Sequence, residues 1–269
     1  MCGSILFFLM MVSINSVAKA DPANMGVSVA ERVQASANLR QFNLWMNAPW
    51  RDNDGNFAQV RNQIESSIQS GQKPADLMQL YKPDAKKYPD AAILQFRYYY
   101  AAYEAGIEDQ TANGHAEAMI RVGDLFILIL KGHLPHTYNY VRLGFLCALF
   151  SDPLGNYSLK NVGNQLFAKD PSDVLVKYAL TSLLVDGPDP NDRTMALKYS
   201  LEMVHQYPSN LRIVGMLGYA YYVQWRTSHS KIDASHAIDA YQQYLDLAPA
   251  DNYFRPTAQN LINEIRNSE

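Results

Sequence analysis

The sequence predicts an all-α protein, and three observations support this fold class. Apolar residues recur at the helical spacing i, i+3, i+4 from Val27 onward. No stretch of the sequence shows the sustained apolar and polar alternation, bounded by hairpin turns, that is typical of β-strands. Prolines that follow apolar helical stretches divide most of the chain into segments of similar length, and we expect each to end one helix shortly before the next begins.

The composition is that of a folded protein without a marked affinity for polyanions. The 269 residues are 48% hydrophobic and 18% charged, which provides enough apolar side chains for a continuous core. The formal net charge of -3 gives no strong positive field, so we expect no nucleic acid among the partners. The 18 Tyr, 10 Phe and 3 Trp can either fill the core or line a binding surface.

The N-terminal segment predicts export. An unbroken apolar run over residues 5–12 is followed by an Ala-x-Ala motif at 18–20, directly before Asp21, which is typical of a secretory signal. We therefore expect residues 1–20 to be a signal peptide that is cleaved before Asp21, giving a periplasmic or extracellular protein. A bilayer span needs about 20 apolar residues, so we expect no stable membrane span after cleavage.

Prolines define the helical segments. The five prolines that follow helical stretches are Pro89, Pro135, Pro171, Pro208 and Pro249. Successive members are 46, 36, 37 and 41 residues apart, slightly more than the period of about 34 residues known for one class of helix–turn–helix repeat. Four of them are followed two residues later by a residue that commonly caps a helix N-terminus. The pairs are Pro135 with Thr137, Pro171 with Asp173, Pro208 with Asn210 and Pro249 with Asp251, while Pro89 has Asp90 beside it.

One unit shows the repeat pattern most completely. A large, a small and an aromatic residue on its first helix are followed by a small residue, an aromatic residue and a closing proline on its second. These residues are Leu217, Gly218, Tyr221, Ala237, Tyr241 and Pro249. They resemble the signature of the tetratricopeptide repeat family. In that pattern the small residues let two antiparallel helices approach closely while the large ones fill the adjacent space.

The resemblance implies a right-handed α-solenoid of antiparallel helix hairpins, stacked because one hairpin cannot bury its own apolar face. On this basis residues 21–56 form an N-terminal helix and loop, with Asn56 capping the next helix. Residues 57–251 form five hairpins, and residues 252–269 form a C-terminal capping helix. Pro83 should shorten or kink the helix in which it lies.

No motif for catalysis or metal binding stands out. His133 and His136 share a turn, but the sequence supplies no further ligand in a known zinc spacing, so we interpret them as structural or exposed. Cys147 lies in an apolar helix, where a thiol stays protonated and packs in the core. Asp124 faces apolar neighbours, and we expect it to pair with Arg121. We therefore expect no cofactor, no metal and no catalytic residue.

The candidate binding residues follow from the resemblance. In tetratricopeptide repeats the first helix of each hairpin lines the concave face, and five of the seven positions that map there are tyrosines. Such a face would suit an extended peptide or a sugar. The alternative is that the rings pack between hairpins. The positions are Phe96, Tyr100, Tyr103, Tyr178, Arg212, Tyr219 and Tyr222.

Two functions remain open. The first is an exported helical-repeat scaffold that binds a protein or peptide partner, or a carbohydrate, through this aromatic-lined concave face. The second is a helical toroid-type enzyme acting on polysaccharide or cell wall, which would need two carboxylates about 5–10 Å apart across a cleft. We favour the scaffold because the repeat pattern is present and no catalytic motif accompanies it.

Overall fold

The computed structural model describes residues 41, 44–51, 55–88, 90–108, 135–151 and 159–268, without the side chains of 106–108 and 147–151. Within these ranges the protein is helical and forms no β-strand, which confirms the predicted all-α class for this part. None of the helices in these ranges is long and apolar enough to cross a membrane. The predicted signal peptide, Asp124, His133 and the Cys147 side chain lie outside the described residues.

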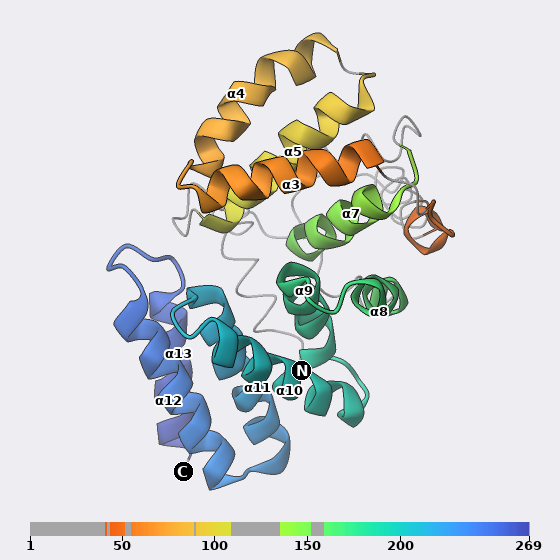
Figure 1. Ribbon diagram of the computed structural model, residues 1–269. Helices are drawn as coiled ribbons and strands as arrows, with labels where there is room; N and C mark the ends of the chain where they lie inside the picture. The colour runs from red at the N-terminus through yellow and green to blue at the C-terminus, as the bar shows by residue number, and fades with distance from the viewer. Residues whose placement is uncertain are drawn as a thin grey trace, which may run out of the picture. The chain divides into compact units, whose positions relative to one another are not determined.

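The described helices belong to two compact units (Figure 1). Residues 10–152 form one unit, which we call the N-terminal unit. Pro153–Glu269 form the main part of the other, which we call the C-terminal unit. The N-terminal unit contains α3 (Gly55–Gln69), α4 (Pro74–Lys87), α5 (Ala92–Glu108) and α7 (Tyr138–Ser151). The C-terminal unit contains α8 (Lys160–Lys169), α9 (Val174–Val185), α10 (Pro190–Gln206), α11 (Leu211–Ser228), α12 (Lys231–Leu247) and α13 (Arg255–Asn267).

Helix α5 lies at the centre of the N-terminal unit. It contacts α3, α4 and α7, so residues on almost every side of it are buried, including 95–96 and 98–103. A helix enclosed in this way carries apolar residues all round instead of one apolar stripe. Its buried polar residue Gln95 donates hydrogen bonds to the carbonyls of Ala85 at 2.7 Å and Tyr88 at 3.1 Å, and so satisfies the end of α4.

Of two local predictions in the N-terminal unit, the cap at Asn56 is wrong and a shortening of the helix at Pro83 does not occur. Helix α4 continues through Pro83 to Lys87. The ring of Pro83 is exposed, and Ala85 beyond it is buried, so packing of α4 continues past the lost hydrogen bond. Helix α3 begins at Gly55, which places Asn56 inside the first turn and not at the cap.

Helices of the C-terminal unit pack on their neighbours along the chain. Each of α8 to α12 contacts the next helix, and α9 also contacts α11. The most extensive of these contacts joins α11 and α12, which lie side by side in Figure 1 and are connected by only His229 and Ser230. His229 adopts the left-handed conformation, with φ of 53°, that commonly ends a helix.

The close approach of α11 and α12 depends on Gly218. A Cβ atom at this position would lie 2.8 Å from two ring carbons of Tyr241, closer than any ordinary contact. Tyr241 and Ala237 are both fully buried on the facing helix. The predicted close packing of Gly218 against a large aromatic ring is therefore confirmed for Tyr241.

Helix caps in the C-terminal unit follow the sequence closely, with one exception. The Asp173 carboxylate accepts hydrogen bonds from the first turn of α9, and the Asn210 side chain does the same for α11, as predicted. Asp251 does not cap a helix. Its neighbour Asn252 instead accepts a hydrogen bond from the Phe254 backbone N–H at 2.9 Å, and α13 begins later. The predicted last helix is present, and its buried stripe packs against α12.

Candidate functional site

The structure divides the seven predicted binding positions between the two units. Phe96, Tyr100 and Tyr103 lie on α5, Tyr178 lies on α9, and Arg212, Tyr219 and Tyr222 lie on α11. The three α5 residues and the last two on α11 are buried, while Tyr178 and Arg212 are half-buried. The buried aromatic rings therefore pack between helices. The hydroxyls of the tyrosines are the polar groups that they offer to hydrogen-bond partners.

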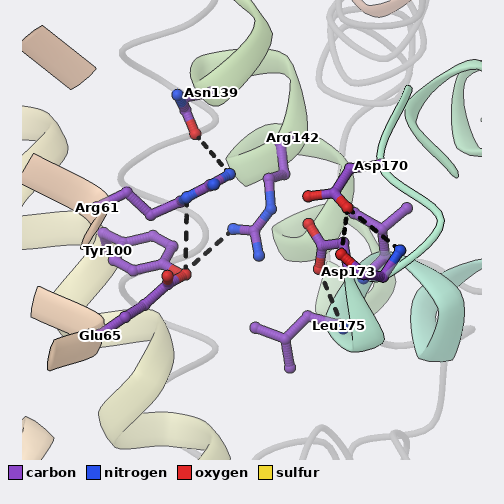
Figure 2. Close-up of polar contacts among 10 residues, drawn as sticks. Arg61, Glu65, Tyr100, Asn139, Arg142, Asp170, Asp173 and Leu175 are labelled. Carbon is purple, nitrogen blue, oxygen red and sulfur yellow. Dashed lines mark hydrogen bonds and ion pairs between the residues drawn. The ribbon is translucent and has the colours of Figure 1, made fainter. Parts of the chain in front are cut away.

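Tyr100 lies in a polar network of the N-terminal unit, shown in Figure 2. Its hydroxyl donates to Glu65 Oε1 at 2.6 Å and accepts a hydrogen bond from Arg142 at 3.3 Å. The Arg142 guanidinium also lies 5.6 Å from the Tyr100 ring centre. Arg61 lies 3.7 Å from Glu65 and donates to Asn139 at 3.1 Å. The network therefore links α3, α5 and α7.

This network fits a structural role in the N-terminal unit. Arg142 and Asn139 are 3% and 2% exposed, and polar groups this deeply buried require hydrogen-bonding partners. Burial is the main reason that the pKa of Tyr100 is raised well above its ordinary value, and the Arg142 charge opposes it. Tyr100 is thus a neutral hydrogen-bond donor at physiological pH and cannot act there as a base.

Tyr222 repeats this arrangement in the C-terminal unit. Its hydroxyl donates to Glu264 at 2.8 Å and accepts from Arg226 at 3.3 Å, and the guanidinium lies 5.8 Å from the ring centre. Burial, followed by the hydrogen bond to Glu264, raises the pKa of Tyr222 to about 12. The neutral hydroxyl therefore connects a cation on α11 with a carboxylate on α13.

Tyr219 extends this line of polar groups toward α9. Its ring stacks on that of Tyr222, with centres 6.2 Å apart and planes inclined by 22°. Its hydroxyl donates to Asp186 at 2.7 Å. Desolvation raises the pKa of Asp186, although the hydrogen bond from Tyr219 opposes this effect. We call Asp186, Tyr219, Tyr222, Glu264 and Arg226 the tyrosine row.

The tyrosine row reaches the edge of a pocket of about 440 Å³. Helix α11, the start of α12 and the end of α13 supply its walls. Two members of the row, Arg226 and Glu264, line the pocket directly, so the row and the pocket share these two charged side chains. The lining residues are Trp225, Arg226, His229, Lys231, Glu264 and Ser268.

Tyr178 and Arg212 form a further pair. Burial raises the pKa of Tyr178, and the Arg212 guanidinium nearby opposes this effect. The structure thus brings these two predicted residues together, from α9 and α11.

His136 is held by backbone groups of the N-terminal unit. Its Nε2 lies 2.7 Å from the Trp45 carbonyl oxygen, and its ring packs edge-on against the Trp45 indole at 4.6 Å. These contacts are those of a structural histidine. Within the ranges that the structure describes, no three His, Cys, Asp or Glu side chains are gathered in a way that could hold a metal ion.

Sequence reasoning missed the charged partners of the tyrosines. Arg226 follows Tyr222 by four residues, a spacing that places both on one helix face, so this contact could have been found. Asp186 lies in the loop between α9 and α10, and Glu264 lies on the predicted capping helix. Their contacts join helices that are distant in sequence, and no local pattern predicts them.

Comparison with known proteins gives no relative from which a function could be inferred. No protein-family model, curated protein or solved structure matches this chain.

Proposed function

We propose that this chain is an exported helical-repeat scaffold that binds a protein or peptide partner, and that the C-terminal unit carries the binding face. The observation that supports this most directly is the tyrosine row with its adjoining pocket. In it, the exposed charged groups of Asp186, Glu264 and Arg226 are held in place by partly buried hydrogen bonds to the tyrosine hydroxyls. Export is supported by the sequence pattern of residues 1–20, and the repeat architecture by the helix contacts.

The solenoid arrangement is part of the proposal. In the C-terminal unit the main contacts join helices adjacent in the chain, or α9 with α11, the first helices of successive hairpins. Contacts restricted to near neighbours are typical of stacked hairpins, where each repeat packs only on the next. The spacing of Gly218 and Tyr241 adds the close helix–helix contact that such hairpins use.

The tyrosine row suits recognition because its charges are held in place before a ligand arrives. Asp186 and Glu264 are exposed, and each accepts a hydrogen bond from a buried tyrosine. The tyrosine rings cannot turn without disturbing the core. Charged groups fixed in this way lose less conformational entropy on binding than mobile surface side chains do. Two carboxylates and the Arg226 guanidinium can pair with backbone amides and charged side chains of a polypeptide.

The experiment that tests this proposal has two steps. The mature chain is immobilised, partners are captured from the extracytoplasmic fraction of the native host, and a captured protein is purified. Its affinity is then measured by calorimetry for the native chain, for Glu264→Gln and for the matched control Asp239→Asn, an exposed carboxylate on α12. Glutamine retains an acceptor for the Tyr222 hydroxyl and removes only the charge.

We expect Glu264→Gln to weaken binding about tenfold, because a hydrogen bond to a charged group contributes about 1.5 kcal/mol or more. Asp239→Asn should leave the affinity unchanged. A partner that binds both variants with native affinity would contradict the assignment of the binding face.

A further inference from the structure

We infer that the pocket beside the tyrosine row binds a carboxylate group of the partner peptide, either a C-terminal carboxylate or an acidic side chain. This inference extends the proposed function and depends on it for the identity of the ligand. Its basis is the juxtaposition of Arg226, His229 and Lys231 around one cavity with a single carboxylate, Glu264.

The charge of the lining favours a monoanion. Among the described lining residues, Arg226 and Lys231 supply two positive charges and Glu264 supplies one negative charge, which leaves an excess of one positive charge. A carboxylate neutralises this excess. A phosphate dianion would carry more negative charge than this excess can balance.

The cations on the two sides of the pocket differ in how they are held. Arg226 is positioned by its hydrogen bond to the Tyr222 hydroxyl and by its place against the Tyr222 ring. Lys231 begins α12, directly after the Ser230 cap, where the helix N-terminus adds a partial positive charge. Within the described residues the Lys231 ammonium makes no hydrogen bond or ion pair, so its donors can serve a ligand.

The left-handed turn at His229 places these groups around the cavity. With φ of 53°, the chain reverses between α11 and α12 within two residues, so the last turn of α11 and the first residue of α12 line the same pocket. The conformation is uncommon for residues other than glycine and asparagine. His229, which lies between Arg226 and Lys231 along the chain, adds its imidazole to the lining.

The size and the apolar wall of the pocket fit one amino-acid residue. Pockets of about 300–1,000 Å³ are typical of small-ligand sites, and this one, at about 440 Å³, lies at the lower end. Trp225 forms the apolar wall and is fixed against Tyr222, with ring centres 5.6 Å apart. A carboxylate with an apolar or aromatic side chain next to it would contact both the cations and the indole.

The test is an NMR titration of the isotope-labelled full chain with three probes: N-acetylphenylalanine, its neutral amide, and inorganic phosphate. We expect N-acetylphenylalanine to shift backbone amides of residues 225–231 and 264–268, with at least tenfold weaker binding of the amide and of phosphate. Lys231→Met should weaken N-acetylphenylalanine binding about fivefold, as expected for loss of one partly solvated ion pair. Lys198→Met, which changes an exposed lysine on α10, should have no effect.

Equal binding of the acid and its amide would overturn the inference, as would shifts confined to other helices or an undiminished affinity for Lys231→Met. These outcomes are separate from failure of the proposed function. A captured partner that depends on Glu264 but not on Lys231 would overturn the carboxylate site alone. If every captured protein were insensitive to Glu264→Gln, the proposed binding face would be contradicted. Lys231-dependent binding of N-acetylphenylalanine would still support the carboxylate site in that case.

Discussion

Substituting Gly218 by alanine tests the packing of α11 on α12 with a single methyl group. The added Cβ would lie 2.8 Å from Cδ1 and Cε1 of Tyr241 and 3.1 Å from its Cγ. Because Cγ is the ring atom nearest the backbone, a rotation of the ring cannot relieve all three contacts. Tyr241 is fully buried, so its neighbours also oppose a displacement of the whole side chain.

Two opposing effects determine the magnitude. Overpacking of a buried site costs about 1–3 kcal/mol, while replacing glycine by alanine inside a helix stabilises it by about 1 kcal/mol. Since two ring carbons are approached at 2.8 Å at once, we take the upper part of the first range. We expect Gly218→Ala to lower the free energy of unfolding by about 1.5 kcal/mol, or the Tm by about 5 °C.

Urea unfolding followed by far-ultraviolet circular dichroism measures this change. The control is the same substitution in the background of Tyr241→Leu, which removes the ring. There the alanine should be neutral or stabilising, because only its gain in helix propensity remains. A Gly218→Ala protein as stable as the native chain, or more stable, would refute the close-packing argument.

Three further predictions concern other positions of the C-terminal unit. Tyr241→Phe should raise the free energy of unfolding by about 1 kcal/mol in thermal unfolding, because the Tyr241 hydroxyl is buried without a hydrogen-bond partner among the described residues. Asn210→Ala should destabilise the protein by about 1 kcal/mol through loss of the α11 cap, whereas Asp251→Ala should not; a larger loss for Asp251→Ala would contradict the observed helix start. Folding raises the pKa of Tyr222 to about 12, whereas the unfolded residue ionises at about pH 10. The contribution of Tyr222 to the free energy of unfolding is therefore complete below about pH 10 and is lost as the pH rises toward 12. Tyr222→Phe should reduce this alkaline loss in unfolding curves measured from pH 9 to 12, and an unchanged pH dependence would contradict the assigned environment.

Local chemistry explains which features of the fold were predictable. The caps at Asp173 and Asn210 depend on hydrogen bonds to residues two or three positions away, which the sequence displays directly. The predicted cap at Asp251 is wrong because Asn252, an equally suitable residue, lies beside it and forms the turn before α13. Pro83 does not end α4, because burial of Ala85, a tertiary effect, maintains the helix beyond the proline.

The candidate site was predictable only in part, for a similar reason. The positions of Tyr219 and Tyr222 on one helix follow from their spacing, and their stacked rings agree with it. Their burial depends on how α9, α12 and α13 surround α11. The contact of Tyr222 with Glu264 spans 42 residues of sequence, so it requires the arrangement of helices and not a motif.

Hydrogen–deuterium exchange of the chain with and without a captured partner, read by mass spectrometry, tests the central claim most directly. The account predicts slower exchange on binding in peptides that cover residues 225–231, at the turn between α11 and α12, and residues 255–268 of α13. These segments line the pocket and carry Arg226 and Glu264. Slower exchange confined to α3, α4 and α5, with these segments unchanged, would contradict it.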